Sequence, residues 1–330
     1  MIDTSNPEIM FAIDAARQAA LLVRQVQLEM VTPVLTKEDR SPVTVADFAS
    51  QALISRMLTE AFPEDALVAE EDAAGLRAAE GYDNLNQVTK FVKRSIPEAA
   101  PASVCDWIDR GQGSSGKRFW TLDPIDGTKG FLRGDQYAVA LALIVDGRVQ
   151  VAALGCPHLS DAYRPSIGEN GSLLVAARDQ GSWTTALETP GDYCQLRVSQ
   201  IENPSQARIL RSVESGHTNV NQVDHFAAAL GVEADPVRLD SQAKYAVLAA
   251  GKGELYLRLL SPDRPDYREK IWDQAAGSLI LEEAGGRITD LDGKPLDFTT
   301  GRSLTNNRGI LASNYLLHSA ALSALREVDA

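Results

Sequence analysis

The chain has 330 residues, of which 44% are apolar and 23% charged, a composition typical of a folded globular protein rather than a disordered one. Because one hydrophobic core seldom serves a chain of this length, we expect two domains, residues 1–200 and 201–330. The formal net charge of −13 argues against nonspecific binding to nucleic acid, which depends on clustered basic side chains.

The first 120 residues contain mainly helical patterns. Apolar residues recur at helical spacing from a predicted helix start at residue 7 to about residue 30, and a second helix is predicted over 44–62. The segment 81–115 is polar and irregular, and we expect a surface insertion there around one helix at about 84–95.

From Phe119 the pattern changes to strands. The predicted strands are FWTLD, YAVALALIV, RVQVAAL and SLLVAA, and an Asp146-Gly147 turn joins the second to the third as an antiparallel hairpin. After about Ser199, strands and helices alternate, with strands ARILRS, ELYLRLL, GRITD and GILAS and helices near 220–230, 241–250, 273–284 and the C-terminus. The sequence therefore predicts an α/β half that follows an α+β half.

Local sequence also argues against a membrane span, a secretory signal and a cysteine-bound metal. The longest apolar stretches are too short to span a bilayer, and the first ten residues lack the basic and apolar regions of a secretory signal. The cysteines Cys105, Cys156 and Cys194 have no metal-ligand spacing, and their odd number suits reduced thiols. We expect a monomer in the cytoplasm or another reducing compartment, with a small-molecule substrate and no membrane or nucleic-acid partner.

Residues 122–128, LDPIDGT, place two carboxylates three positions apart. We expect the strand to end at Asp123 because Pro124 cannot continue a ladder, so that Asp123 and Asp126 project from a strand-to-turn corner. Such a corner could direct both side chains to one cation, and carboxylate oxygens are the ligands that Mg²⁺ prefers. The alternative is a polar turn in which Asp123 only caps the strand.

Other acidic residues have ordinary structural explanations when each is considered alone. LVAEED, residues 67–72, ends an apolar run with three acids and could be a solvated loop. Asp47 could be the third residue of a capping box that begins at Thr44. Asp273 could be the N-cap of an apolar helix, although a capping carboxylate can still offer its outer oxygen to a metal.

Two further positions could bind a nucleotide. Thr128 follows Gly127 at a predicted helix start, where its hydroxyl and backbone N–H groups could bind a phosphate oxygen or simply cap the helix. In ELYLRLL, alternation places Tyr256 and Arg258 together, opposite a buried leucine face. An aromatic side chain beside an arginine could receive a base and a phosphate, and an exposed strand face explains the pair equally well.

The ordered set LVAEED, WTLDPIDGTKGF and WDQAAGSLILEEAGG resembles the lithium-sensitive, metal-dependent inositol monophosphatase superfamily. Within it, DPIDGTKGFLRGDQYAVALALIVDG and LDSQAKYAVLAAGKGELYLRL are similar to the branch of 3′(2′),5′-bisphosphate nucleotidases, which remove the 3′-phosphate of adenosine 3′,5′-bisphosphate. The resemblance covers nearly the whole chain and implies a five-layered αβαβα sandwich.

The resemblance also implies a role for individual residues. Two or three Mg²⁺ ions would be held by Glu70, Asp123, the backbone carbonyl of Ile125, Asp126 and Asp273. Asp47 and Thr128 would orient and deprotonate the attacking water. The nucleotide and its phosphates would be bound by Gly127, Thr128, His217, Ser241, Lys244 and Arg258. The choice of Glu70 over Glu71 as ligand depends on the family pattern GEE, which is AEE here.

The implied reaction is in-line attack by a metal-activated water, without a covalent intermediate. 3′-Phosphoadenosine 5′-phosphosulfate could be a further substrate. One alternative is hydrolysis of inositol phosphates, including the 1-phosphate of inositol 1,4-bisphosphate. Another is a catalytically silent nucleotide sensor, and the intact carboxylates argue against it.

Overall fold

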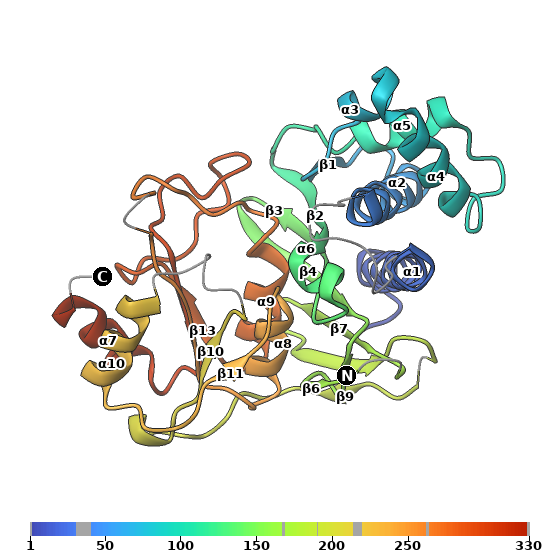
Figure 1. Ribbon diagram of the computed structural model, residues 1–330. Helices are drawn as coiled ribbons and strands as arrows, with labels where there is room; N and C mark the ends of the chain where they lie inside the picture. The colour runs from blue at the N-terminus through green and yellow to red at the C-terminus, as the bar shows by residue number, and fades with distance from the viewer. Residues whose placement is uncertain are drawn as a thin grey trace.

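The computed structural model describes residues 2–30, 41–166, 169–189, 191–213, 220–261 and 264–328. Its elements form five layers in the order helices, sheet, helices, sheet, helices (Figure 1). The three helical layers are α1 (Pro7–Met30) with α2 (Ser41–Ala61), α8 (Ala243–Ala249) with α9 (Ala275–Glu283), and α7 (Val220–Leu230) with α10 (His318–Glu327). The αβαβα sandwich implied by the resemblance is therefore confirmed.

The first sheet has seven strands in the order β1-β2-β3-β4-β7-β8-β9. They are β1 (Ala66–Ala69), β2 (Arg118–Asp126), β3 (Ala138–Val145), β4 (Arg148–Cys156), β7 (Ser172–Ala177), β8 (Ser182–Ala186) and β9 (Cys194–Gln195). Among the described strands of this sheet, β1 and β2 are parallel and the other neighbouring pairs are antiparallel. Asp146 and Gly147 both have positive φ between β3 and β4, which confirms the predicted tight hairpin.

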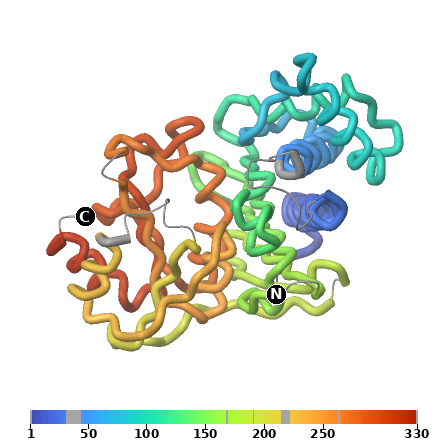
Figure 2. Tube along the Cα trace, in the orientation of Figure 1, coloured from blue at the N-terminus to red at the C-terminus, as the bar shows by residue number. Residues whose placement is uncertain are grey.

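The second sheet has five strands in the order β11-β10-β12-β14-β13. They are β10 (Ile209–Arg211), β11 (Val237–Arg238), β12 (Leu255–Arg258), β13 (Arg287–Thr289) and β14 (Ile310–Ser313). Figure 2 shows the first sheet with its outer helices in blue to green on one side of the molecule, and the second in yellow to red on the other. The boundary between domains 1–200 and 201–330 falls between the two sheets and stays a prediction.

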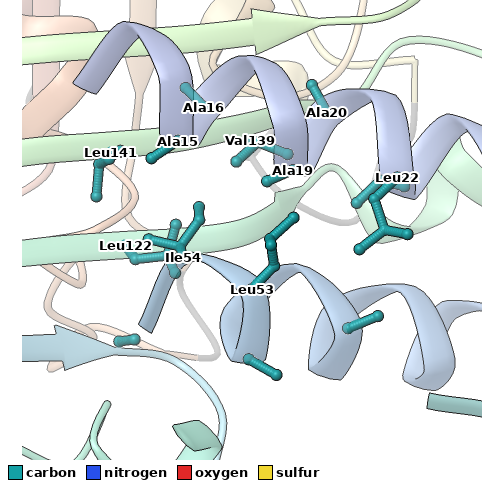
Figure 3. Packing of buried hydrophobic residues seen from close by; sticks show 14 of the residues in the cluster. Ala15, Ala16, Ala19, Ala20, Leu22, Leu53, Ile54, Leu122, Val139 and Leu141 are labelled. Carbon is teal, nitrogen blue, oxygen red and sulfur yellow. The ribbon is translucent and has the colours of Figure 1, made fainter. Parts of the chain in front are cut away.

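The buried apolar residues form three clusters that lie between these layers. One joins α1 and α2 to the first sheet, one surrounds α8 and α9 between the sheets, and one joins the second sheet to α7 and α10. In the first cluster, small side chains of α1 such as Ala15 and Ala19 lie over Val139 and Leu141 of β3 (Figure 3). Because both faces of β3 are covered, its sequence is an unbroken apolar run rather than an alternating one.

The segment 81–115 is more ordered than expected. It contains α4 (Tyr82–Val92) and α5 (Pro101–Asp109), and Val88, Phe91 and Ile108 are buried in the first core cluster. The prediction of a surface insertion was therefore wrong in part, and α5 was missed although Pro101 occupies a favoured first helical position. The shorter elements are α3 (Ala74–Arg77), α6 (Thr128–Arg133), the hairpin β5 (Leu159–Ser160) and β6 (Arg164–Pro165), and the 3-10 turns 79–81 and 204–206.

Two further expectations can be compared with the described part of the chain. Cys105, Cys156 and Cys194 are all free thiols, as predicted. None of the described helices combines the length and apolar character needed to cross a bilayer.

Candidate active site

The corner at residues 123–128 differs from its prediction in one respect. Strand β2 does not stop at Asp123 but continues through Pro124 to Asp126, because Asp123 pairs with Ala140 and Asp126 pairs with Ala138. Two residues of β2 thus lie opposite one of β3, which makes a bulge that accommodates the missing N–H of the proline. The Asp123 carboxylate accepts the Ile125 N–H at 3.1 Å within this bulge.

Glu70 enters the same region from the neighbouring strand. Because β1 and β2 are parallel and Ala69 pairs with Leu122, the residues that follow this pair, Glu70 and Asp123, lie at the same edge of the sheet. Gln51 of α2 holds this strand end, since its side chain donates to the Glu71 carbonyl at 2.7 Å and accepts the Glu71 N–H at 3.1 Å. The backbone of the segment is therefore anchored by hydrogen bonds, while Glu70 and Asp72 are exposed, as in the solvated loop that the sequence allowed.

Asp47 and Asp273 approach from two different layers, and neither is the helix cap that the sequence suggested. Helix α2 begins at Ser41, so Thr44 is already helical and cannot open a capping box with Asp47. Helix α9 begins at Ala275 with Gln274 as its N-cap, so Asp273 precedes the cap. Asp47 is buried, and its pKa is raised by that burial and by the charges of Glu71 and Glu70.

The charges of these acids act on one another. Burial raises the pKa of Asp123, and the charges of Glu70, Asp126, Asp273 and Asp47 raise it further. Although Glu70 is partly exposed, the protein around it removes water from its carboxyl group, and this effect with the charges of Glu71 and Asp126 raises its pKa to about 7. The charge of Glu70 raises the pKa of both Asp123 and Asp273, so Glu70 lies near both carboxyl groups.

The donor set suits a hard divalent cation. Among the described residues, no three or more His, Cys, Asp or Glu side chains are close enough to form a ready-made metal cage. The acids instead form a looser group of oxygen donors, of which Asp47 and Asp123 are buried, Asp126 and Asp273 half-buried and Glu70 exposed. A cation would relieve their mutual repulsion. Carboxylate oxygens without histidine or thiolate favour Mg²⁺ over zinc or copper.

Gly127 and Ser241 bring the two halves of the chain into contact at this corner. Gly127 has a φ of 93° and precedes α6, and a Cβ at this position would lie 2.8 Å from the Cβ of Ser241. Ser241 itself has a φ of 65°, an unusual conformation for a residue with a side chain. Thr128, the first residue of α6, has an exposed side chain beside this contact.

Lys244 and Arg258 form a cationic side of the site. The ammonium of Lys244 is buried 5.1 Å from the ring centroid of Tyr256, and burial lowers its pKa to about 8 while Asp126 opposes this. Arg258 donates to Glu269 at 3.0 Å. Both cations counteract the effect of burial on the pKa of Asp126, so they lie near the acidic corner.

The strand face that carries Tyr256 and Arg258 is not exposed, contrary to one of the two explanations offered by the sequence. Tyr256 is only 5% exposed and belongs to the middle core cluster. The leucines of β12 face the outer cluster, as alternation predicted. His217 lies outside the described residues.

Sequence reasoning missed several residues that support the site. Gln242 donates its N–H to the Asp126 carboxylate at 2.7 Å, and its side chain contacts the Trp272 carbonyl and the Gly277 N–H at 3.0 Å each. Gln242 follows Ser241 in LDSQAKYAVLAAGKGELYLRL, one of the strings that carry the resemblance. Arg302 lies far from every motif, and no local signal identified it.

Known proteins are similar to this chain over nearly its whole length. The model of the inositol monophosphatase family matches residues 5–330. A 3′(2′),5′-bisphosphate nucleotidase of Schizosaccharomyces pombe is 41% identical over 327 residues, covering 93% of this chain and 92% of the relative. A protein of the same name from Oryza sativa is 41% identical and covers 97% of this chain and 94% of its own.

Solved structures agree on the fold. The Thermotoga maritima IMPase superposes with a TM-score of 0.64 at 20% identity, covering 98% of each chain. Mycobacterium tuberculosis SuhB superposes with a TM-score of 0.63 at 21% identity, covering 97% of this chain and 96% of its own. At these identities the likeness concerns the fold alone.

Proposed function

The chain belongs to the inositol monophosphatase family, and from this premise we propose that it is a Mg²⁺-dependent phosphomonoesterase that removes the 3′-phosphate of adenosine 3′,5′-bisphosphate. The observation that carries the proposal is that carboxylates from three parts of the chain lie near enough to act on the pKa of Asp123, namely at the end of β1, in the bulge of β2 and before the cap of α9. Relatives about 40% identical over nearly their full length bear the nucleotidase name, which supports the choice of substrate.

In this proposal Glu70, Asp123, the Ile125 carbonyl, Asp126 and Asp273 hold two or three Mg²⁺ ions. When bound, Mg²⁺ supplies positive charge for the phosphate oxygens and makes a coordinated water more acidic. The hydroxyl of Thr128, with Asp47 as the proton acceptor, orients the attacking water in line with the scissile bond. The product is AMP with free phosphate.

The nucleotide would lie on the side of the corner that residues 241–258 provide. Lys244 and Arg258 carry the charge that its phosphates require, and the close contact of Gly127 with Ser241 would place backbone groups beside them. His217 is assigned to the same role from the resemblance alone. 3′-Phosphoadenosine 5′-phosphosulfate presents the same 3′-phosphate and would be a further substrate.

A phosphate-release assay with adenosine 3′,5′-bisphosphate tests the metal requirement. We expect no activity in excess EDTA, recovery with Mg²⁺, and inhibition by Li⁺. Ca²⁺ should occupy the acidic group without supporting the reaction, because it prefers longer bonds and more ligands than in-line attack allows. Full activity in excess EDTA would reject the proposal.

A further inference from the structure

An arginine from near the C-terminus holds the strand end that leads into Glu70. Nη1 of Arg302 donates to the Gly111 carbonyl at 3.2 Å, and Nη2 donates to the Ala69 carbonyl. The same Gly111 carbonyl accepts the Ala69 N–H at 2.8 Å. The guanidinium therefore closes a small network of backbone hydrogen bonds directly before Glu70.

The same side chain also contacts the segment that leads into Asp273. The guanidinium lies 4.7 Å from the ring centroid of Trp272, which is buried. The backbone carbonyl of Arg302 accepts the Ile271 N–H at 3.2 Å. Arg302 thus contacts both Ile271 and Trp272, the two residues immediately before Asp273.

From Trp272 the contacts continue to the bulge of β2. The Trp272 carbonyl accepts the side-chain amide of Gln242 at 3.0 Å, and the Gln242 N–H donates to Asp126 at 2.7 Å. Segments from the first sheet, the second half of the chain and the loop after β13 are therefore linked through two polar side chains.

We infer that Arg302 is a positioning residue that sets the separation of Glu70 and Asp273 and so assembles the cation site from the two halves of the chain. The inference rests on the proposed metal site. Arg302 lies outside every sequence motif from which that site was predicted. Arg302 is not a ligand and need not touch the substrate.

The charge of Arg302 and its hydrogen bonds should have opposite effects on Mg²⁺ affinity, so the two can be distinguished. A fixed positive charge near Glu70 repels an incoming cation, so if charge were its main effect, removing it would tighten Mg²⁺ binding. If Arg302 mainly holds the two ligand segments in place, removing it would weaken Mg²⁺ binding, as loss of the groups that orient ligands usually does.

The measurement is Mg²⁺ binding by isothermal titration calorimetry to the metal-stripped full chain without substrate. The variants are Arg302→Met, which removes charge and hydrogen bonds, and Arg302→Lys, which keeps the charge but cannot span the two carbonyls. Arg178→Met is the matched control, because Arg178 is also partly buried and donates to a backbone carbonyl, that of Val149, and to Glu282. Binding is compared where each variant keeps the wild-type near-ultraviolet circular dichroism.

We expect both Arg302 variants to bind Mg²⁺ roughly tenfold more weakly than wild type, and Arg178→Met to bind it normally. Unchanged or tighter binding by Arg302→Met would overturn the inference. Should that variant fail to fold, Arg302→Lys decides, since wild-type affinity would mean that a cation alone suffices. If wild type itself bound no Mg²⁺, both the proposed metal site and this inference would be rejected. If wild type and the Arg302 variants bound Mg²⁺ equally well, only the inference would be rejected.

Discussion

At the scale of a single residue, Asp126 takes part in a hydrogen bond and in several charge interactions at once. Its carboxylate accepts the Gln242 N–H, its charge raises the pKa of Asp123, and Lys244 and Arg258 counteract the effect of its burial. Without a bound cation, the site therefore holds acidic side chains against their mutual repulsion. A substitution at Asp126 can therefore separate its charge as a metal ligand from its hydrogen bond to Gln242.

Asp126→Asn should separate them. The amide oxygen can still accept the Gln242 N–H, so the fold should survive, and the melting temperature in EDTA should not fall because one repelling charge has gone. Mg²⁺ binding and kcat should both drop, because the amide oxygen is a weaker ligand. Activity as a function of Mg²⁺ concentration measures the effect, and wild-type rates at limiting Mg²⁺ would show that Asp126 is not part of the cation site.

Lys244 and Arg258 allow a test of substrate recognition. If they bind the nucleotide, Lys244→Met and Arg258→Met should each lose charge-assisted hydrogen bonds of about 1.5–3 kcal/mol, roughly ten- to hundredfold in kcat/KM for adenosine 3′,5′-bisphosphate. The loss for inositol 1,4-bisphosphate should be smaller. Equal losses on both substrates would place the two cations at a phosphate site that every substrate shares.

At the scale of elements, α1 packs closely against β4 because Gly155 of β4 has no side chain. A Cβ on Gly155 of β4 would lie 2.5 Å from the Cβ of Ala20 and 3.0 Å from the Ala16 carbonyl oxygen. The first distance is too short for two carbon atoms and the second is tight, so a side chain at position 155 would push α1 away from the sheet.

Gly155→Ala should therefore destabilise the fold by about 1–3 kcal/mol, the usual cost of overfilling a well-ordered interior. Gly116→Ala is the matched control, since a Cβ there would meet nothing within 4 Å. Urea unfolding measures both variants. A Gly155→Ala protein as stable as the control would mean that α1 shifts at little cost.

His318 at the start of α10 should make stability depend on pH. It is buried between the Thr289 and Ser313 hydroxyls, at 3.0 and 2.8 Å, and burial with the nearby charge of Arg287 lowers its pKa to about 4. Below its ordinary pKa of about 6.5 the unfolded chain takes up a proton that the folded chain refuses. The stability that neutral His318 contributes is thus present above pH 6.5 and is lost as the pH falls towards 4.

The expected slope in this window is at most about 1.4 kcal/mol per pH unit. Because carboxyl groups titrate in the same range, the measured quantity is the difference in free energy of unfolding between wild type and His318→Asn. That difference should shift in favour of the variant as the pH falls from 7 to 4.5. A difference that stays constant would show that His318 becomes protonated in the folded protein at its ordinary pKa.

At the scale of the whole molecule, the sequence predicted most of the elements because each depends on neighbours along the chain. The α1 pattern, the β3–β4 hairpin and the alternating second half are local signals, and the structure confirms them. The five layers followed from the resemblance. The extension of β2 through Pro124 was missed because a bulge is defined by the partner strand, which a local pattern does not contain.

The candidate site shows the same limit. Asp123 and Asp126 are three positions apart, so their common corner could be predicted, and Glu70 and Asp273 could be added only by resemblance. Gln51 and Arg302 could not be predicted, since their partners at Glu71 and Ala69 lie 20 and 233 residues away and backbone carbonyls leave no mark in the sequence. The assignments of Asp47, Thr128 and His217 to water or nucleotide stay predictions.

The central claim is that this acidic corner hydrolyses a nucleotide 3′-phosphate. Its most direct test is kcat/KM with Mg²⁺ for adenosine 3′,5′-bisphosphate, inositol 1-phosphate, inositol 1,4-bisphosphate and fructose 1,6-bisphosphate, with AMP identified as the nucleotide product. We predict the highest value for adenosine 3′,5′-bisphosphate and release of its 3′-phosphate only. A preference for either inositol phosphate, or binding of the nucleotide without phosphate release, would contradict the account.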